Sequence, residues 1–152
     1  MTRQAIHSGA APAAIGPYSQ AIRAGGTVYL SGQIGLDPAT GNLRDGTEAQ
    51  ARQVFANLKA VAAAAGGTLD DMVKVTLLLV DMADFAQVNE IMASFFTQPY
   101  PARATYQVAA LPKNPRVEVE AILVTPIAIA PMSAEGPLQG ANSAPSGGSA
   151  AA

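Results

Sequence analysis

Residues 72–80, MVKVTLLLV, decide the fold class of this chain. The run is rich in β-branched and aliphatic residues and has aspartates before and after it, which is typical of a buried β-strand. Aliphatic side chains occupy both of its faces, with Val75, Leu77 and Leu79 on one face and Leu78 and Val80 on the other. A strand of this kind needs apolar cover on both sides.

One amphipathic helix is predicted before this strand in the sequence and one after it. The first opens at Thr47 and ends at glycines 66 and 67, and its apolar residues recur at helical spacing: Val54, Phe55, Leu58, Val61, Ala62 and Ala65. The second opens after Asp84 and ends before prolines 99 and 101, with an apolar face made of Phe85, Val88, Ile91, Met92 and Phe95. Both starts have the spacing of a capping box, Thr47 with Gln50 and Asp84 with Gln87.

Further strands are predicted at residues 27–34, 103–109 and 116–124, and the turn at residues 16–20 leads into one more. The order is two strands, a helix, a strand, a helix and two strands. This is an α+β layout, a mixed sheet with two helices packed on one face. The other face, which carries Leu78 and Val80, would remain apolar and uncovered, so we expect a homo-oligomer. The alternative is an unusually apolar free surface.

The composition indicates one domain with a tail. The chain has 152 residues, and residues 1–127 form a body of domain size. Residues 128–152 are almost entirely Ala, Gly, Pro and Ser, so we expect a flexible C-terminal appendage. Cysteine is absent and His7 is the one histidine, which excludes disulfides, a cysteine nucleophile and a multi-histidine metal site. His7 has no suggestive neighbours and is interpreted as structural or exposed.

The charge balance argues against nucleic acid as a partner. Nine Lys and Arg residues face eleven Asp and Glu residues, a formal charge of −2, and no two basic residues are adjacent. No stretch approaches the roughly 20 apolar residues that a membrane helix needs, and the first 15 residues lack an apolar signal-peptide core. We expect a soluble, cytoplasmic protein without a membrane partner.

Three charged residues are candidates for chemistry. Arg103 opens an apolar strand, where its planar fork could grip a substrate carboxylate or could form a structural ion pair with an acid. Glu118 and Glu120 lie two residues apart on a strand and therefore share a face. A carboxylate in a partly dry cleft could move protons near neutrality, whereas the spacing alone favours an ordinary outward polar face.

Two short segments could contribute to a pocket. Tyr18, in the turn Gly-Pro-Tyr-Ser-Gln, could present its hydroxyl to a ligand or simply pack. Ser31 and Gly32 end a strand, and a glycine there allows close approach of a ligand to the backbone.

Together these residues resemble the Rid family of enamine/imine deaminases, also called the YjgF-type or L-PSP family, and most closely its RidA branch. The most specific segments are PARATYQVAAL at residues 101–111 and VEVEAI at residues 117–122. They are supported by AIGPYSQ at residues 14–20, SGQ at residues 31–33, and Phe85 with Val88 and Asn89. The resemblance covers about residues 3–125.

The resemblance implies a chorismate-mutase-like fold assembled as a homotrimer with clefts between subunits. It implies hydrolysis of the reactive small molecules 2-iminopropanoate and 2-iminobutanoate, and their enamine tautomers, to 2-keto acids and ammonia, with no cofactor or metal. The family's catalytic positions fall on Arg103, Glu118 and Tyr18, and its substrate-binding positions on Arg103, Ser31, Gly32, Asn89 and Thr105. Thr105 stands where some members have cysteine, which bears on substrate preference.

Two other functions remain open from the sequence. Family members have also been named endoribonucleases or translation inhibitors. A non-catalytic binder of small carboxylates, or a chaperone-like trimer, would keep the same cleft without turnover.

Overall fold

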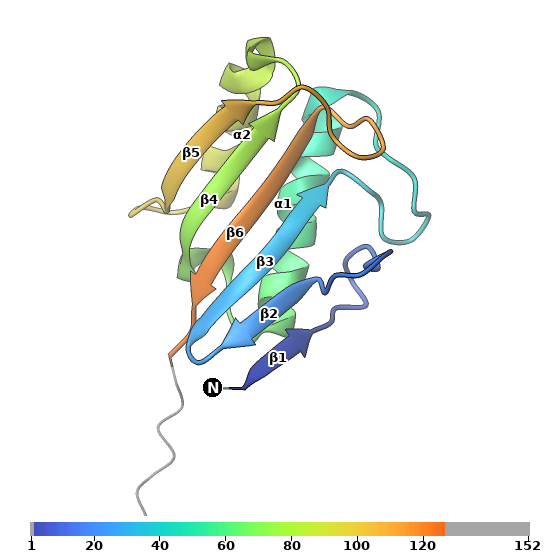
Figure 1. Cartoon of the computed structure of the whole chain (residues 1–152). Coiled ribbons are helices and arrows are strands. Elements are labelled where there is room, and N and C mark those ends of the chain that lie inside the picture. The colour runs from blue at the N-terminus through green and yellow to red at the C-terminus, as the bar shows by residue number, and fades with distance from the viewer. Residues whose placement is uncertain (1, 127–152) are drawn as a thin grey trace, which may run out of the picture.

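The structure, a computed structural model, describes residues 2–126, and the predicted tail at residues 128–152 lies outside the described residues. These residues form a six-stranded sheet with the order β1-β2-β3-β6-β4-β5 (Figure 1). β4 and β5 run parallel and the other neighbours are antiparallel. The elements are β1 (Arg3–Ile6), β2 (Ala21–Ala24), β3 (Thr27–Ile34), α1 (Gly46–Ala64), β4 (Met72–Leu79), α2 (Phe85–Phe95), β5 (Ala102–Gln107) and β6 (Val117–Val124).

Both helices lie on the same face of the sheet, as Figure 1 shows, which confirms the predicted α+β layout. The core lies between them and the sheet. It is built from alternate residues of the central strands and the apolar stripe of α1, and its largest fully buried side chains include Phe55, Leu58, Leu77, Leu79 and Leu123. Phe55 contacts the rings of Phe95 and Phe96 at centroid distances of 5.4 and 5.9 Å, which fixes α2 against α1.

The predicted capping boxes are wrong. Neither Asp45, the N-cap of α1, nor Asp84, the N-cap of α2, makes a side-chain cap hydrogen bond. Thr47 lies inside α1 and not at its cap, and the side chains of Gln50 and Asp84 make tertiary contacts instead. The buried Gln50 donates to the carbonyl of Arg44 at 2.9 Å and accepts from the backbone N–H of Arg116 at 2.7 Å. Asp84 accepts two hydrogen bonds from the Arg116 guanidinium, at 3.0 and 2.6 Å.

The second face of the sheet is uncovered within the described chain, and it carries both apolar and charged side chains. Leu78 of β4 pairs with Tyr106 of β5, and Tyr29 of β3 pairs with Ile122 of β6, so these four side chains share this face. Tyr29 and Tyr106 are 52% and 57% exposed, although aromatic side chains of this size are normally covered. We call this surface the open face. The expected exposed apolar side chains are therefore present, but the same face also carries Lys74, Thr76, Glu118 and Glu120, so it is less apolar than the sequence predicts.

β3 carries an irregularity where it passes the candidate site. The pairing with β6 shifts between Leu30 and Gln33, so that Ser31 and Gly32 together stand opposite the single residue Glu120. This is a β-bulge, a feature that is over-represented beside active sites because it redirects side chains.

Candidate active site

A cavity of about 570 Å³ lies beside Glu118, at the end of the sheet where β3 finishes. Its walls come from the N-terminal loop, the end of β3 and the turn before β6. The structure brings four predicted site residues together in its lining: Tyr18, Ser31, Gly32 and Glu118. Most of the remaining wall is apolar and includes Pro12, Ile15, Ile34, Leu36 and Pro112. We call this the Glu118 cavity.

The N-terminal loop is held against the cavity by one buried amide. Gln20 is 2% exposed, accepts from the Ser8 N–H at 2.6 Å, and donates to the carbonyls of Ser8 and Pro12 at 3.1 and 2.8 Å. The Ser31 hydroxyl donates to the Ser19 carbonyl at 2.6 Å. The loop that carries Tyr18 is therefore fixed at both ends, because buried amide networks of this kind stabilise one geometry.

Glu118 lies directly against Gly32. A β-carbon at position 32 would be 2.0 Å from the Glu118 Oε1 atom, so the carboxyl group fills the space that any larger residue would need. Burial raises the pKa of Glu118, and the negative charge of Glu120 raises it further. A carboxyl group with a raised pKa exchanges protons closer to neutral pH, as a general acid or base requires.

Arg103 lines a second cavity, of about 440 Å³, together with Asn89, Met92, Ala93, Tyr100 and Pro101. Its Nη1 atom donates to the Asn89 Oδ1 atom at 2.5 Å, and its guanidinium lies 5.3 Å from the centre of the Phe85 ring. Both contacts come from α2, and they orient the guanidinium without neutralising it. We call this the Arg103 cavity.

The structural alternative for Arg103 does not hold. The ion pairs in residues 2–126 are those of Arg44, Arg52 and Arg116, and no carboxylate faces Arg103. Arg103 is exposed at the cavity. An uncompensated guanidinium of this kind is suited to a carboxylate from outside the described chain.

One chain does not bring Arg103 and Glu118 together. Arg103 pairs with Val75 of β4 on the helix-covered face, whereas Glu118 pairs with Leu78 on the open face. From this register the two α-carbons are roughly 14 Å apart, given 3.3 Å per residue and 4.8 Å per strand. A small substrate therefore cannot contact both groups of the same chain.

The other candidates divide between these places. Asn89 accompanies Arg103, and Thr105, half-buried two residues further along β5, lines neither cavity. His7 is exposed, in agreement with its interpretation, and it lines neither cavity.

Two features of the site are not among the sequence-based candidates. Phe85 and Met92 hold Arg103 together with Asn89, and their spacing of 85, 89 and 92 on one helix face was a signal for this. Lys113 lines the Glu118 cavity from a turn in which it has the left-handed φ of 66°. Such a conformation is uncommon for lysine, and sequence does not reveal it.

Within residues 2–126, no group of three or more His, Asp or Glu side chains is placed to hold a metal ion. None of the helices described here has the length and apolar character needed to cross a membrane.

Comparison with known proteins identifies the family. Residues 8–125 match the family model described as Endoribonuclease L-PSP. The chain is 52% identical over 123 residues to the 2-iminobutanoate/2-iminopropanoate deaminase of Mus musculus, covering 80% of this chain and 91% of the mouse protein.

Solved structures agree in fold. The crystal structure of RidA from the Antarctic bacterium Psychrobacter is 55% identical with a TM-score of 0.79, covering 80% of this chain and 99% of that one. E. coli TdcF with bound serine is 42% identical with a TM-score of 0.78, covering 80% and 98%. The chain therefore belongs to the L-PSP family, which confirms the resemblance to the RidA-type Rid proteins that its sequence carries.

Proposed function

We propose that this protein is a 2-iminobutanoate/2-iminopropanoate deaminase, which hydrolyses reactive 2-imino acids to 2-keto acids and ammonia. The relatives from mouse, cattle and man carry this name and are 52%, 50% and 48% identical to the chain. The observation that carries the proposal is the uncompensated guanidinium of Arg103 in an exposed cavity, because every substrate of this class has a carboxylate next to the reacting carbon.

Arg103 binds that carboxylate. Asn89 and Phe85 fix the guanidinium plane, so its fork is preorganised for two parallel hydrogen bonds. Each charge-assisted bond contributes about 1.5–3 kcal/mol. The grip orients C2 of the imine toward a water molecule.

Glu118 accepts and donates protons during the reaction. The water oxygen forms a bond to C2, and the imine nitrogen takes up a proton, which gives a tetrahedral amino alcohol. The hydroxyl then loses its proton and becomes a carbonyl as the C–N bond breaks. The nitrogen gains a proton and leaves as ammonia. The raised pKa of Glu118 fits a group that accepts a proton from water and returns it to nitrogen. Tyr18, Ser31 and Gly32 of the Glu118 cavity are proposed to hold the water and the intermediate. Thr105, on the Arg103 side of the sheet, would join them only from a second copy of the chain.

We infer that the complete site forms between copies of the chain, in a homotrimer. Arg103 and Glu118 lie on opposite faces of one sheet, so a second copy has to supply one of them. The exposed aromatic side chains of the open face, Tyr29 and Tyr106, support such an assembly. The serine in E. coli TdcF, itself a small carboxylate, is consistent with a family site of this size.

The second candidate is ribonuclease activity, since the family model is described as an endoribonuclease. Arg44, Arg52 and Arg116 each pair with a carboxylate, which weakens them as phosphate ligands. A ribonuclease assay on highly purified parent and Arg103→Ala protein separates the two functions. Binding of keto acids without any turnover would instead support the non-catalytic carboxylate binder.

The direct test couples the protein to a threonine dehydratase and follows the decay of 2-iminobutanoate. We expect Arg103→Ala to lose roughly 100-fold in kcat/KM, the equivalent of about one or two charge-assisted bonds. Arg103→Lys should also be poor because an ammonium cannot form the fork. An Arg103→Ala protein as fast as the parent would rule out the carboxylate grip.

A further inference from the structure

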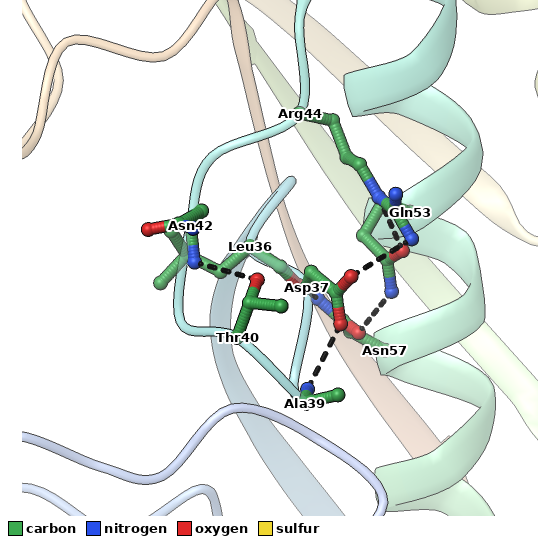
Figure 2. Close-up of polar contacts among 8 residues, drawn as sticks. All are labelled: Leu36, Asp37, Ala39, Thr40, Asn42, Arg44, Gln53 and Asn57. Carbon is green, nitrogen blue, oxygen red and sulfur yellow. Dashed lines mark hydrogen bonds and ion pairs between the residues drawn. The ribbon is translucent and has the colours of Figure 1, made fainter.

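A chain of polar side chains ties the loop after β3 to helix α1 (Figure 2). The Arg44 Nη2 atom pairs with the Asp37 Oδ2 atom at 3.1 Å, and the Arg44 Nε atom donates to the Gln53 Oε1 atom at 3.2 Å. The Gln53 Nε2 atom then donates to the Asn57 Oδ1 atom at 2.8 Å. We call Asp37, Arg44, Gln53 and Asn57 the loop clamp.

The inner end of the loop clamp holds the wall of the Glu118 cavity. Asn57 is 1% exposed, and its Nδ2 atom donates to the carbonyls of Ile34 at 3.2 Å and Leu36 at 3.0 Å. Both of these residues line the cavity, and Ile34 is the ladder partner of Glu118 itself. Because β3 leaves the sheet after Ile34, the Asn57 amide holds this part of the wall together with the backbone contacts of residues 34–36.

The outer end of the loop clamp lies at the surface. The Arg44 side chain is 48% exposed and that of Asp37 is 20% exposed, so the chain of contacts runs from solvent through α1 to the cavity wall. Each amide has its oxygen and its nitrogen both engaged, which leaves one consistent arrangement.

We propose that the loop clamp is a positioning device for the reaction, which sets the distance between the cavity wall and Glu118 through the backbone of Ile34 and Leu36. This inference rests on the proposed deaminase function. A displacement of about 1 Å in a site can cost as much as roughly 100-fold in rate, even when the change is remote from the chemistry. Arg44, Gln53 and Asn57 are positioning residues and need not touch the substrate.

A matched pair of variants separates this role from a general effect on stability. Arg44→Gln breaks the outer end of the clamp. Arg52→Gln breaks an ion pair of the same 3.1 Å length within α1, with an arginine side chain that is 52% exposed and makes no clamp contact. Exposed ion pairs contribute little to stability, so both variants should melt close to the parent. Gln53→Leu breaks the middle of the clamp and tests the buried part without removing Asn57.

We expect Arg44→Gln and Gln53→Leu to lower kcat/KM for 2-iminobutanoate about five- to tenfold, and Arg52→Gln to stay within about twofold of the parent. A second readout is the pH profile. A loosened wall admits water to Glu118, which weakens the burial that raises its pKa, so the limb that reports Glu118 should move to lower pH. The other titratable groups near it, namely Tyr18, Lys113 and Glu120, are unchanged in these variants.

The inference is overturned if Arg44→Gln and Gln53→Leu match Arg52→Gln in kcat/KM and in the pH limb while Arg103→Ala loses activity. It is equally overturned if they lower only the melting temperature. Wild-type activity in Arg103→Ala would instead contradict the proposed function, and with it the positioning role of the loop clamp.

Discussion

The two faces of the sheet differ in what covers them and in which chemical group they carry. The helix-covered face is closed by α1 and α2, and at its edge the contacts of α2 hold Arg103 in a fixed orientation. The open face has no cover in the described chain, and it carries Glu118 at one end and exposed aromatic side chains across it. One chain therefore cannot bring together Arg103 and Glu118, the two halves of the proposed site.

If the proposed site is correct, this division would link assembly to activity. Hydrolysis of an imino acid by the proposed mechanism needs a carboxylate-binding group and a proton carrier within a few ångströms of each other. In a single chain the sheet lies between these two groups. An oligomer in which the open face is covered can join the two halves, so burial of apolar surface and formation of the site would be the same event.

The largest effect is expected in a complementation experiment, which tests whether the two faces contribute to one shared site. Arg103→Ala and Glu118→Gln chains should each lose about 100-fold in activity, because each lacks one half of the site. Co-assembled in equal amounts as a trimer, they should recover about a quarter of the parent activity, since about one cleft in four receives both intact groups.

The control for complementation is a mixture of Arg103→Ala with Arg103→Lys, in which no cleft can receive an intact guanidinium. Differently tagged chains that are purified together show whether mixed assemblies have formed. Mixed assemblies without recovery would mean that Arg103 and Glu118 do not act in one shared site.

The second prediction concerns the open face itself. Tyr106→Glu places a charge beside Leu78 on a surface that a partner would bury, and an unpaired buried charge is costly. We expect a smaller species in light scattering after gel filtration, and a loss of activity of roughly tenfold or more as assembly fails. Met82→Glu is the matched control, because Met82 is 43% exposed but lies outside the sheet, in the turn before α2. Identical elution of both variants and the parent would contradict an interface on this face.

The secondary structure of the two faces follows largely from periodicity. The strand predicted at residues 27–34 coincides with β3, and the alternation along residues 72–80 ends one residue beyond β4. β1, with the sequence RQAI, is not predicted because it is four residues long and exposed at three of them, so it has almost no apolar pattern. The capping boxes fail for another reason, since Gln50 and Asp84 are used by contacts with Arg116, more than 30 positions away.

The sequence proposes the site as a set of residues, which stays a prediction, but it does not give their arrangement. Arg103, Glu118 and Tyr18 follow from the family resemblance, and their residue types suit the chemistry. That Tyr18 and Glu118 share a cavity while Arg103 lies on the other face follows from strand order and register. Strand order and register depend on pairings between segments that are distant in sequence, and local sequence patterns do not encode such pairings. The contact between Gly32 and Glu118 further requires the bulge in β3.

The third prediction sharpens the open-face half of the site. In Gly32→Ala the new methyl group would occupy the place of the Glu118 carboxyl, 2.0 Å from its Oε1 atom, so the carboxyl group must move. The side chain is flexible at this end, and we expect kcat/KM to fall about tenfold with little change in melting temperature. Gly9→Ala is the control, because a β-carbon there meets nothing within 4 Å. Activity equal to that of Gly9→Ala would show that the position of the Glu118 carboxyl is unimportant.

The smallest expected effect concerns the two glutamates on the open face. Burial is the larger cause of the raised pKa of Glu118, and the charge of Glu120 is the smaller one. Glu120→Gln removes the like charge, so ionised Glu118 becomes easier to form and its pKa falls. The limb of the kcat/KM profile that reports Glu118 should therefore move to lower pH, by less than about one unit, since burial remains.

Glu90→Gln, an exposed neutralisation on α2, controls for the change in net charge. If Glu118 acts as the base, activity of Glu120→Gln at acidic pH should exceed that of the parent, because more of the carboxylate is present there. If this limb of the pH profile stays in place or moves to higher pH, a group other than Glu118 controls it. The open face would then supply the shape of the cleft and an interface, and its proton carrier would have to be sought on the side of the site that holds Arg103.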